Sequence, residues 1–163
     1  MSGPLSRLRV LDLSRVLACP WCTQMLADLG ADVIKIERPD VGDDTRHLGP
    51  PVIQGRDGPT RDAVYFTSAN RNKRSLALDI ATPAGQELIR ELARECDVFV
   101  ENFKAGDLDR YGLGYDAIRA INPRIVYCSI TGYGLDGPYA KRPGYDFLAQ
   151  GEGGLMSING HRD

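Results

Sequence analysis

Five short apolar stretches, rich in Val, Ile and Leu, recur along the chain with amphipathic segments between them. They predict strands over residues 8–14, 32–38, 75–79, 97–102 and 124–131. Because helical segments alternate with these strands, the pattern predicts a parallel, doubly wound α/β sheet. In such a sheet, ligands are expected at the carboxyl ends of the strands.

The segments between the strands carry helix start and stop signals. Pro20 suits the first turn of a helix, where its missing N–H costs nothing, and Gly30 stands where a left-handed stop is expected. Thr82 and Pro83 mark a second start, and a third helix is expected within residues 114–123. Apolar spacing predicts the buried positions of the first two helices: Cys22, Met25, Leu26 and Leu29, then Leu88, Ile89, Leu92 and Cys96.

Two stretches rich in glycine and proline interrupt this alternation, at residues 38–64 and 132–146. The first is far longer than the few residues that usually join elements, so it is expected to be functional or mobile. The length of 163 residues suits one globular domain, or a piece of a larger one.

Charge and hydropathy narrow the function classes. Twenty basic and twenty-two acidic side chains give a net charge of -2, without the basic excess that nonspecific nucleic-acid binding needs, so no nucleic-acid partner is expected. No apolar run approaches the roughly 18 residues of a membrane span, and Arg7 and Arg9 interrupt the opening where a signal peptide must be apolar. We therefore expect a soluble, cytoplasmic protein without a membrane partner.

The cysteines and histidines offer little support for a metal site. Cys96 and Cys128 sit in strand-like apolar settings and are expected to be buried thiols, which fits a reducing compartment. The two histidines, His47 and His161, are too scattered for a His-built zinc site, so no metal is expected. The Cys-x-x-Cys motif at residues 19–22 follows a strand at a helix start, which is the geometry of thiol redox sites, although small apolar packing explains it equally well.

Basic residues at the predicted strand ends could bind an anion. Glu37 and Arg38 directly follow a strand, where a Rossmann-like sheet recognises a nucleotide ribose, and Arg15 adds a second cation on the same sheet edge. The turn after the first strand lacks the G-x-G-x-x-G pattern, which disfavours a standard NAD site. The alternative for Arg38 is a solvated strand-end charge.

Two further segments contain candidate binding groups. The charge run at residues 70–75 is typical of a solvated face. Asn102 and Phe103 end a predicted strand and could supply an amide and a stacking ring for an adenine base, with Arg110 following on a short helix. The alternative is a loop cap, with the Phe103 ring packed into the core.

Several motifs taken together resemble the amino-terminal portion of the family III CoA-transferases. They are GADVIKIERP, NRNKRSLALD, DVFVENFKAG, RIVYCSITGYGLDGPYAKRPGYDFLAQ and GGLMSING, in this order. The resemblance covers nearly the whole chain. It implies a Rossmann-like fold with helices on both faces of the sheet, an interlocked homodimer, and coenzyme A as a substrate in place of any prosthetic group.

The resemblance also implies coenzyme contacts. By position in the family's motifs, they are Arg15, Val16, Leu17, Ala18, Arg38, Leu78, Asn102, Phe103, Lys104, Arg110, Tyr145 and Asp146. The chain departs from formyl-CoA transferases at Arg15 and Leu17, where they carry His and Gln, and at Ala105, where Pro is usual. Related acyl-CoA racemases carry a proton-abstracting His at the position of Tyr145, so transfer is favoured over racemisation. The run from YCSITGYG to GYD most resembles family members that act on dicarboxylates such as succinate and glutarate.

The family's reaction uses an Asp carboxylate that attacks the acyl-CoA thioester and carries the group through an anhydride and an aspartyl thioester. The resemblance places this nucleophile after Asp163, the last residue. We therefore expect residues 1–163 to form an incomplete CoA-binding domain, with the second domain and catalytic segment beyond it. The chain alone is expected to be inactive.

Three alternatives remain from the sequence. The chain could be a non-catalytic CoA- or nucleotide-binding module, a thiol oxidoreductase built on the Cys-x-x-Cys motif, or an NADP-dependent reductase. Loss of activity on substitution of Cys19 would support the thiol oxidoreductase. Tighter binding of NADP than of CoA in a titration would support the reductase.

Overall fold

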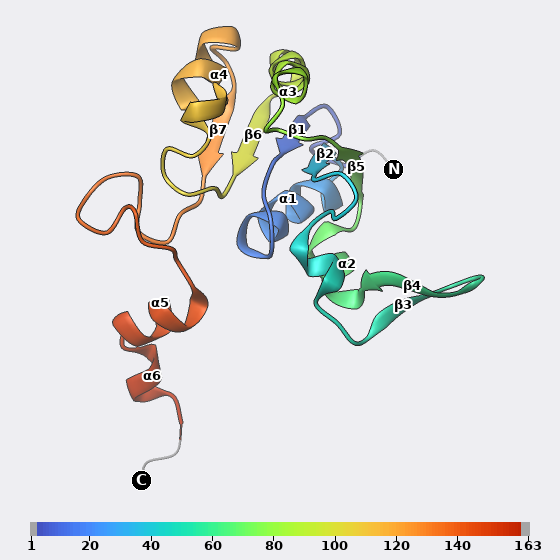
Figure 1. The fold of residues 1–163 in the computed structure, drawn as a ribbon, viewed down its shortest axis with the longest axis vertical. Helices are drawn as coiled ribbons and strands as arrows, with labels where there is room; N and C mark the ends of the chain where they lie inside the picture. The colour runs from blue at the N-terminus through green and yellow to red at the C-terminus, as the bar shows by residue number, and fades with distance from the viewer. Residues whose placement is uncertain (1–2, 161–163) are drawn as a thin grey trace.

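The computed structural model describes residues 3–160, so His161 and Asp163 lie outside it. Five parallel strands form one sheet in the order β5-β2-β1-β6-β7, as Figure 1 shows. The strands are β1 (Arg9–Asp12), β2 (Asp32–Glu37), β5 (Lys73–Ala77), β6 (Val98–Glu101) and β7 (Val126–Ser129). The predicted Rossmann-like α/β sheet is confirmed.

Alternation along the strands divides the core into two layers on opposite faces of the sheet. Val10 and Val33 face α1 (Ala18–Asp28), whereas Leu11 and Ile34 face α3 (Pro83–Glu95) and α4 (Tyr115–Ile121). Helices therefore cover both faces, as predicted. Burial of both faces is what gives parallel strands their continuous apolar runs.

Local signals explain where the helices begin and end. The Thr82 hydroxyl accepts a hydrogen bond from the Gly85 N–H at 3.1 Å, and Pro83 follows as the first residue of α3. Gly30 adopts φ +100° directly after α1, as predicted. An added Cβ at Gly30 would lie 2.9 Å from the Gly3 backbone, so glycine is also required there for close packing.

The predicted buried face of α1 is only partly correct, because Cys22 and Leu26 are half-buried and Leu26 packs against the core. Its buried residues are Cys19, Pro20, Thr23, Gln24 and Ala27, whereas Met25 and Leu29 are about half exposed. The reason is polar: the Thr23 hydroxyl donates to Asp12, and the Gln24 amide donates to the carbonyl of Ser68. In α3 and its C-cap, the prediction holds for Ile89 and Cys96, Leu92 is half-buried against the same core, and Leu88 is exposed.

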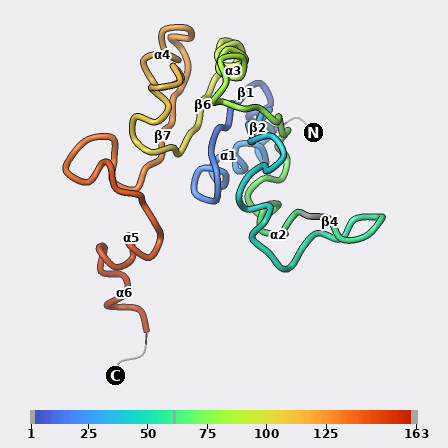
Figure 2. Tube along the Cα trace, viewed as in Figure 1, coloured from blue at the N-terminus to red at the C-terminus, as the bar shows by residue number. Residues whose placement is uncertain are grey.

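The region predicted to be irregular contains a hairpin. Between β2 and β5 the chain forms η1 (Asp44–His47), the antiparallel pair β3 (Val52–Gly55) and β4 (Gly58–Ala63), and α2 (Val64–Asn70). Figure 2 shows that this hairpin projects away from the sheet.

Beyond β7 the chain leaves the body of the molecule. Residues 130–145 form a loop that leads to α5 (Asp146–Glu152) and α6 (Leu155–Ile158), which extend as an arm (Figure 1). The loop closes on itself at its base, because an added Cβ at Gly132 would overlap the backbone of Gly144, and the reverse also holds. Only two glycines allow the chain to cross itself this closely.

Candidate functional site

The candidate site lies at the carboxyl edge of the sheet, between β1 and β6. From β1 the chain continues to β2 on one side, and from β6 it continues to β7 on the other. The loops after these two neighbouring strands therefore diverge and leave a crevice, which is where open α/β sheets bind ligands. One loop carries Arg15, and the other carries Asn102 and Phe103.

Asn102 holds the loop between β1 and α1. Its side-chain oxygen accepts a hydrogen bond from the Arg15 N–H at 2.9 Å, and its side-chain nitrogen donates to the Arg15 carbonyl at 2.7 Å. The side-chain amide thus pairs with both the N–H and the C=O of Arg15 across the crevice. The Arg15 guanidinium in turn lies over the Phe103 ring, with 5.0 Å from its carbon to the ring centre.

A layer of buried charge lies under this loop. The Lys35 ammonium pairs with Asp43 at 2.9 Å, and Lys73 pairs with Asp12 at 3.0 Å. All four side chains are at most 2% exposed. Burial lowers the pKa of Lys73, although the Asp12 carboxylate opposes this shift. Burial alone would raise the pKa of Asp43, but the Lys35 ammonium and the hydrogen bonds from Thr45 together outweigh it and hold that pKa below its ordinary value.

Glu37 and Arg38, adjacent at the end of β2, have different surroundings. The Glu37 carboxylate accepts two hydrogen bonds from Arg46 at 2.8 Å and another from Ser75 at 2.7 Å. Burial alone would raise the pKa of Glu37, but these bonds outweigh it and lower that pKa. Arg38 remains half exposed and pairs only with Asp44 at 2.9 Å among the described residues. Of the two, Arg38 is therefore the group available to a ligand.

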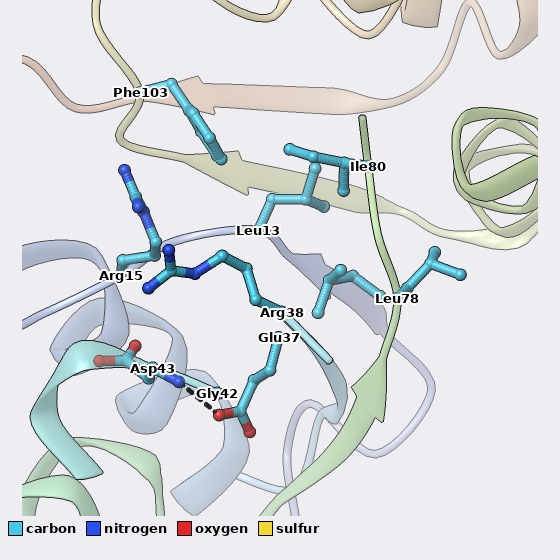
Figure 3. A pocket seen from close by; sticks show the side chains of 10 residues that line it. Leu13, Arg15, Glu37, Arg38, Gly42, Asp43, Leu78, Ile80 and Phe103 are labelled. Carbon is cyan, nitrogen blue, oxygen red and sulfur yellow. Dashed lines mark hydrogen bonds between the residues drawn. The ribbon is translucent and has the colours of Figure 1, made fainter. Parts of the chain in front are cut away.

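Arg38 and Arg15 line one cavity of about 370 Å³, including its open mouth, which we call the Arg38 cavity. Figure 3 shows both guanidinium groups directed into the same space, with apolar side chains on the opposite wall. Its lining residues are Leu13, Arg15, Ile36, Glu37, Arg38, Gly42, Asp43, Leu78, Ile80 and Phe103. The arrangement combines two cations with an apolar wall, which suits a phosphorylated aromatic group.

A second opening, the Tyr145 cleft, continues from the same loops toward the base of the arm. Arg15 and Phe103 line both spaces, so the two are adjacent. Of the predicted residues, the cleft also contains Val16, Ala18, Asn102, Lys104 and Tyr145. Nine of the twelve predicted site residues therefore line the Arg38 cavity or the Tyr145 cleft.

The other three predicted residues lie outside both spaces. Leu17 is the N-cap of α1, and Arg110 lies in η2 (Asp109–Tyr111), 63% exposed over the Tyr111 ring. Asp146 begins α5 and accepts a hydrogen bond from Gln150 at 2.7 Å. Sequence reasoning missed Lys35, Asp43 and Ile80. Only Lys35 has a signal in the sequence, because alternation along β2 places its side chain on a buried face of the sheet.

The cysteine motif has the wrong environment for thiol redox chemistry. Cys19 is fully buried, and its thiol donates to the Glu101 carbonyl at 3.3 Å. Burial raises the pKa of the Cys19 thiol far above neutrality, the opposite of what a reactive thiolate needs. Within residues 3–160, no group of three or more His, Cys, Asp or Glu side chains is placed to hold a metal ion. The helices in that range are also too short or too polar for a bilayer span.

Comparisons with known proteins agree with one another. The sequence model of CoA-transferase family III matches residues 5–163. The chain is 54% identical over 160 residues to a succinate–glutarate CoA-transferase of Agrobacterium fabrum, and 52% identical over 160 residues to a succinyl-CoA:glutarate CoA-transferase of Mus musculus. These alignments cover 98% of the chain but only 40% and 35% of the two relatives. The structure superposes on a CaiB/BaiF family protein from Brucella suis with a TM-score of 0.94 and 53% identity, covering all of this chain and 42% of that one.

Proposed function

The chain belongs to CoA-transferase family III, and on that premise we propose that it carries the coenzyme-binding part of an enzyme that moves CoA from an acyl-CoA thioester to a carboxylic acid. The observation that carries the proposal is the Arg38 cavity. Arg15 and Arg38 enter it from two different strand ends, against an apolar wall that includes Phe103. Coenzyme A has a matching end, a phosphorylated adenosine that joins anionic groups to a flat aromatic base.

In this proposal, one part of the coenzyme occupies the Arg38 cavity and another part occupies the Tyr145 cleft. Arg38 and Arg15 bind phosphate groups, with Leu78 and Phe103 against the base. The pantetheine chain follows the Tyr145 cleft past Val16 and Ala18, and this course brings its thiol toward Tyr145. Because the Asn102 amide is occupied by the N–H and the C=O of Arg15, its role is to shape the site. Arg110 is the least supported contact, since its side chain packs on Tyr111 instead.

The acyl groups in our proposal are dicarboxylates. Both relatives named above act, by their names, on succinate or succinyl-CoA and glutarate. Succinyl-CoA as donor and a dicarboxylic acid as acceptor are therefore the first pair to test. Racemisation of an acyl-CoA is disfavoured because residue 145 is a tyrosine, which is a much weaker base at neutral pH than the histidine this reaction uses.

We place the covalent chemistry outside residues 1–163. In the family's reaction a carboxylate attacks the thioester carbonyl, expels the CoA thiolate and forms an anhydride; the thiolate then attacks the enzyme's carbonyl and releases the donor acid. The acceptor carboxylate reverses these two steps. Since the resemblance puts the nucleophilic aspartate after Asp163, these residues bind the coenzyme without completing turnover. A second domain and a homodimer complete the enzyme.

Calorimetric titration of the 163-residue chain tests the binding proposal. CoA is expected to bind and NADP to bind much more weakly. Arg38→Gln should weaken CoA binding about tenfold, because a charge-assisted hydrogen bond contributes roughly 1.5–3 kcal/mol. The matched control is Arg74→Gln, which also removes an exposed, carboxylate-paired arginine but lies outside the cavity. Equal affinity of the two variants, or tighter binding of NADP, would contradict the proposal.

An acyl-transfer assay tests the rest. The chain, incubated with succinyl-CoA and glutarate, should form no glutaryl-CoA detectable by chromatography. Robust product formation would refute the placement of the nucleophile beyond Asp163.

A further inference from the structure

The pair Lys35 and Asp43 contacts the site loop at two backbone groups, the Ser14 carbonyl and the Val16 N–H. The Lys35 ammonium donates to the Ser14 carbonyl at 2.8 Å while it pairs with Asp43 at 2.9 Å. The carboxylate oxygens of Asp43 both lie 3.3 Å from the Val16 nitrogen, which donates to them. Neither side chain is more than 1% exposed. The pair therefore forms hydrogen bonds to the backbone on either side of Arg15.

Fold stability alone does not require such a pair. Moving two charges out of water is costly, and buried ion pairs can often be replaced by apolar residues of similar volume without loss of stability. Lys35 and Asp43 lie, together with the pair Lys73 and Asp12, on the face of the sheet that also buries Val10 and Val33. What the pair provides that apolar side chains cannot is directed hydrogen bonding to the loop.

The loop needs that bonding because its conformation is unfavourable. Val16 has φ +68°, in the left-handed region that a β-branched residue rarely adopts. A backbone of this kind persists only where its surroundings impose it. The bond from the Val16 N–H to Asp43 is one such restraint, and the Asn102 amide on Arg15 is another.

Asp43 also connects the two arginine-bearing loops. It accepts hydrogen bonds from the Thr45 N–H at 2.9 Å and the Thr45 hydroxyl at 2.7 Å, and so caps η1 beside Asp44, the partner of Arg38. One carboxylate thus fixes both the loop of Arg15 and the loop of Arg38. Asp43 is charged at neutral pH, since its pKa is held below the ordinary value.

We propose that Lys35 and Asp43 are positioning residues, which hold the loop of Arg15 and the loop of Arg38 at the spacing that an anionic ligand requires. This inference rests on the proposed function for the identity of the ligand, coenzyme A. The pair acts through the backbone of Ser14 and Val16. Without it, residue 16 relaxes to negative φ, and Arg15 moves relative to Arg38.

The test replaces both charges at once, as Lys35→Met with Asp43→Leu, so that no buried charge is left unpaired. Hydrogen exchange followed by mass spectrometry on the ligand-free chain reports the loop directly. Amides of residues 14–17 should exchange at least tenfold faster in the double variant, while those of β1 and β6 keep their protection. Titration with CoA should show about a tenfold loss of affinity, the effect expected when one or two residues must be ordered on binding.

Two controls separate positioning from general loss of stability. Ile89→Ala removes core volume on the opposite face of the sheet, and it should lower the melting temperature without changing loop exchange or CoA affinity. If the double variant does not fold, Asp43→Asn is compared with Asp62→Asn. Asp62 pairs with Arg46 at 2.9 Å away from the site loop. Only Asp43→Asn should speed exchange at residues 14–17.

The two proposals fail in different ways. If the unaltered chain does not bind CoA, the proposed function fails, and the exchange experiment still decides the role of the pair. If residues 14–17 keep their protection in the folded double variant, or in Asp43→Asn, the pair does not position the loop. If the loop loosens while CoA affinity stays the same, the positioning has no consequence for binding and the inference is also overturned.

Discussion

Asn102→Ala is the most informative single substitution at the site. It removes the two hydrogen bonds between the side-chain amide and the backbone of Arg15, at 2.9 and 2.7 Å. Each such bond contributes about 0.5–1.5 kcal/mol net, so the free energy of unfolding should fall by about 2 kcal/mol. Because the bonds fix the backbone that carries Arg15, CoA affinity should fall about tenfold as well.

Asn122→Ala is the matched control. Asn122 also bridges two segments through its side-chain amide, which donates to the carbonyls of Ala93 and Cys96 at 2.9 Å each. It lies away from the Arg38 cavity and the Tyr145 cleft, where Cys96 ends α3. The loss of stability should be similar, with CoA affinity unchanged.

Urea denaturation followed by circular dichroism measures the stability of each variant, and calorimetry measures its CoA affinity. The reasoning would be refuted if both variants lost affinity equally, because stability alone would then explain the effect. It would also be refuted if Asn102→Ala lost less than about 0.5 kcal/mol, since the two bonds would then have no net value.

Four further predictions concern the buried groups. Lys73→Met leaves Asp12 buried without its cation, and the free energy of unfolding measured in urea should fall by about 3–5 kcal/mol; a loss below about 1 kcal/mol would mean that water replaces the ammonium. Burial raises the pKa of Glu101, so its charge destabilises the fold at neutral pH. Glu101→Gln should therefore raise the melting temperature at pH 7, and this gain should disappear as the pH falls below 4.5, the ordinary pKa of a glutamate. A gain that persisted at low pH would show a cause other than charge. Glu37 and Asp43 have lowered pKa values, so the stability they contribute is present at neutral pH and should be lost as the pH falls below their ordinary values of 4.5 and 3.8, as acid denaturation can measure. Cys19 and Cys96 should react with a thiol reagent only on unfolding, because burial raises both thiol pKa values, that of Cys96 to about 11; rapid labelling of either in the native state would contradict the structure.

The strands were predictable because parallel strands with both faces covered read as apolar runs. Four of the five lie within their predicted ranges, and β5 begins two residues early, at Lys73. That residue joins the sheet by register, since Lys73 is opposite Val33 of β2. Apolarity does not mark such a position, so its strand character depends on a neighbour that the local sequence does not contain.

The buried charges could not be predicted from local sequence patterns. The run at residues 70–75 is typical of a solvated face, and Arg71 and Arg74 are indeed exposed. Lys73, between them, is 2% exposed because Asp12, 61 residues away, supplies its partner. The same holds for the buried face of α1, where Thr23 is buried by its bond to Asp12. Partners at such separations are set by the fold as a whole.

The structure brings together the predicted site residues at the strand ends and leaves Leu17, Arg110 and Asp146 outside both spaces. Arg15, Arg38 and Phe103 meet because parallel strands bring their carboxyl ends to one edge. For Asn102 the sequence leaves two interpretations, a ligand-facing amide and a loop cap, and its side-chain amide pairs with the backbone of Arg15, as a cap does. Whether the Asn102 amide binds a ligand or the backbone depends on the conformation of the neighbouring loop, which the spacing of residues in the sequence does not predict.

The crossing of Gly132 and Gly144 gives the loop after β7 a narrow neck. The chain enters and leaves this loop at almost the same point, so the residues between the two glycines are joined to the rest of the protein through this neck. Three residues of this segment, Ala140, Arg142 and Pro143, line the Tyr145 cleft together with Gly144 and Tyr145. The close approach of Gly132 and Gly144 thereby ties one wall of the cleft to the chain that leaves β7.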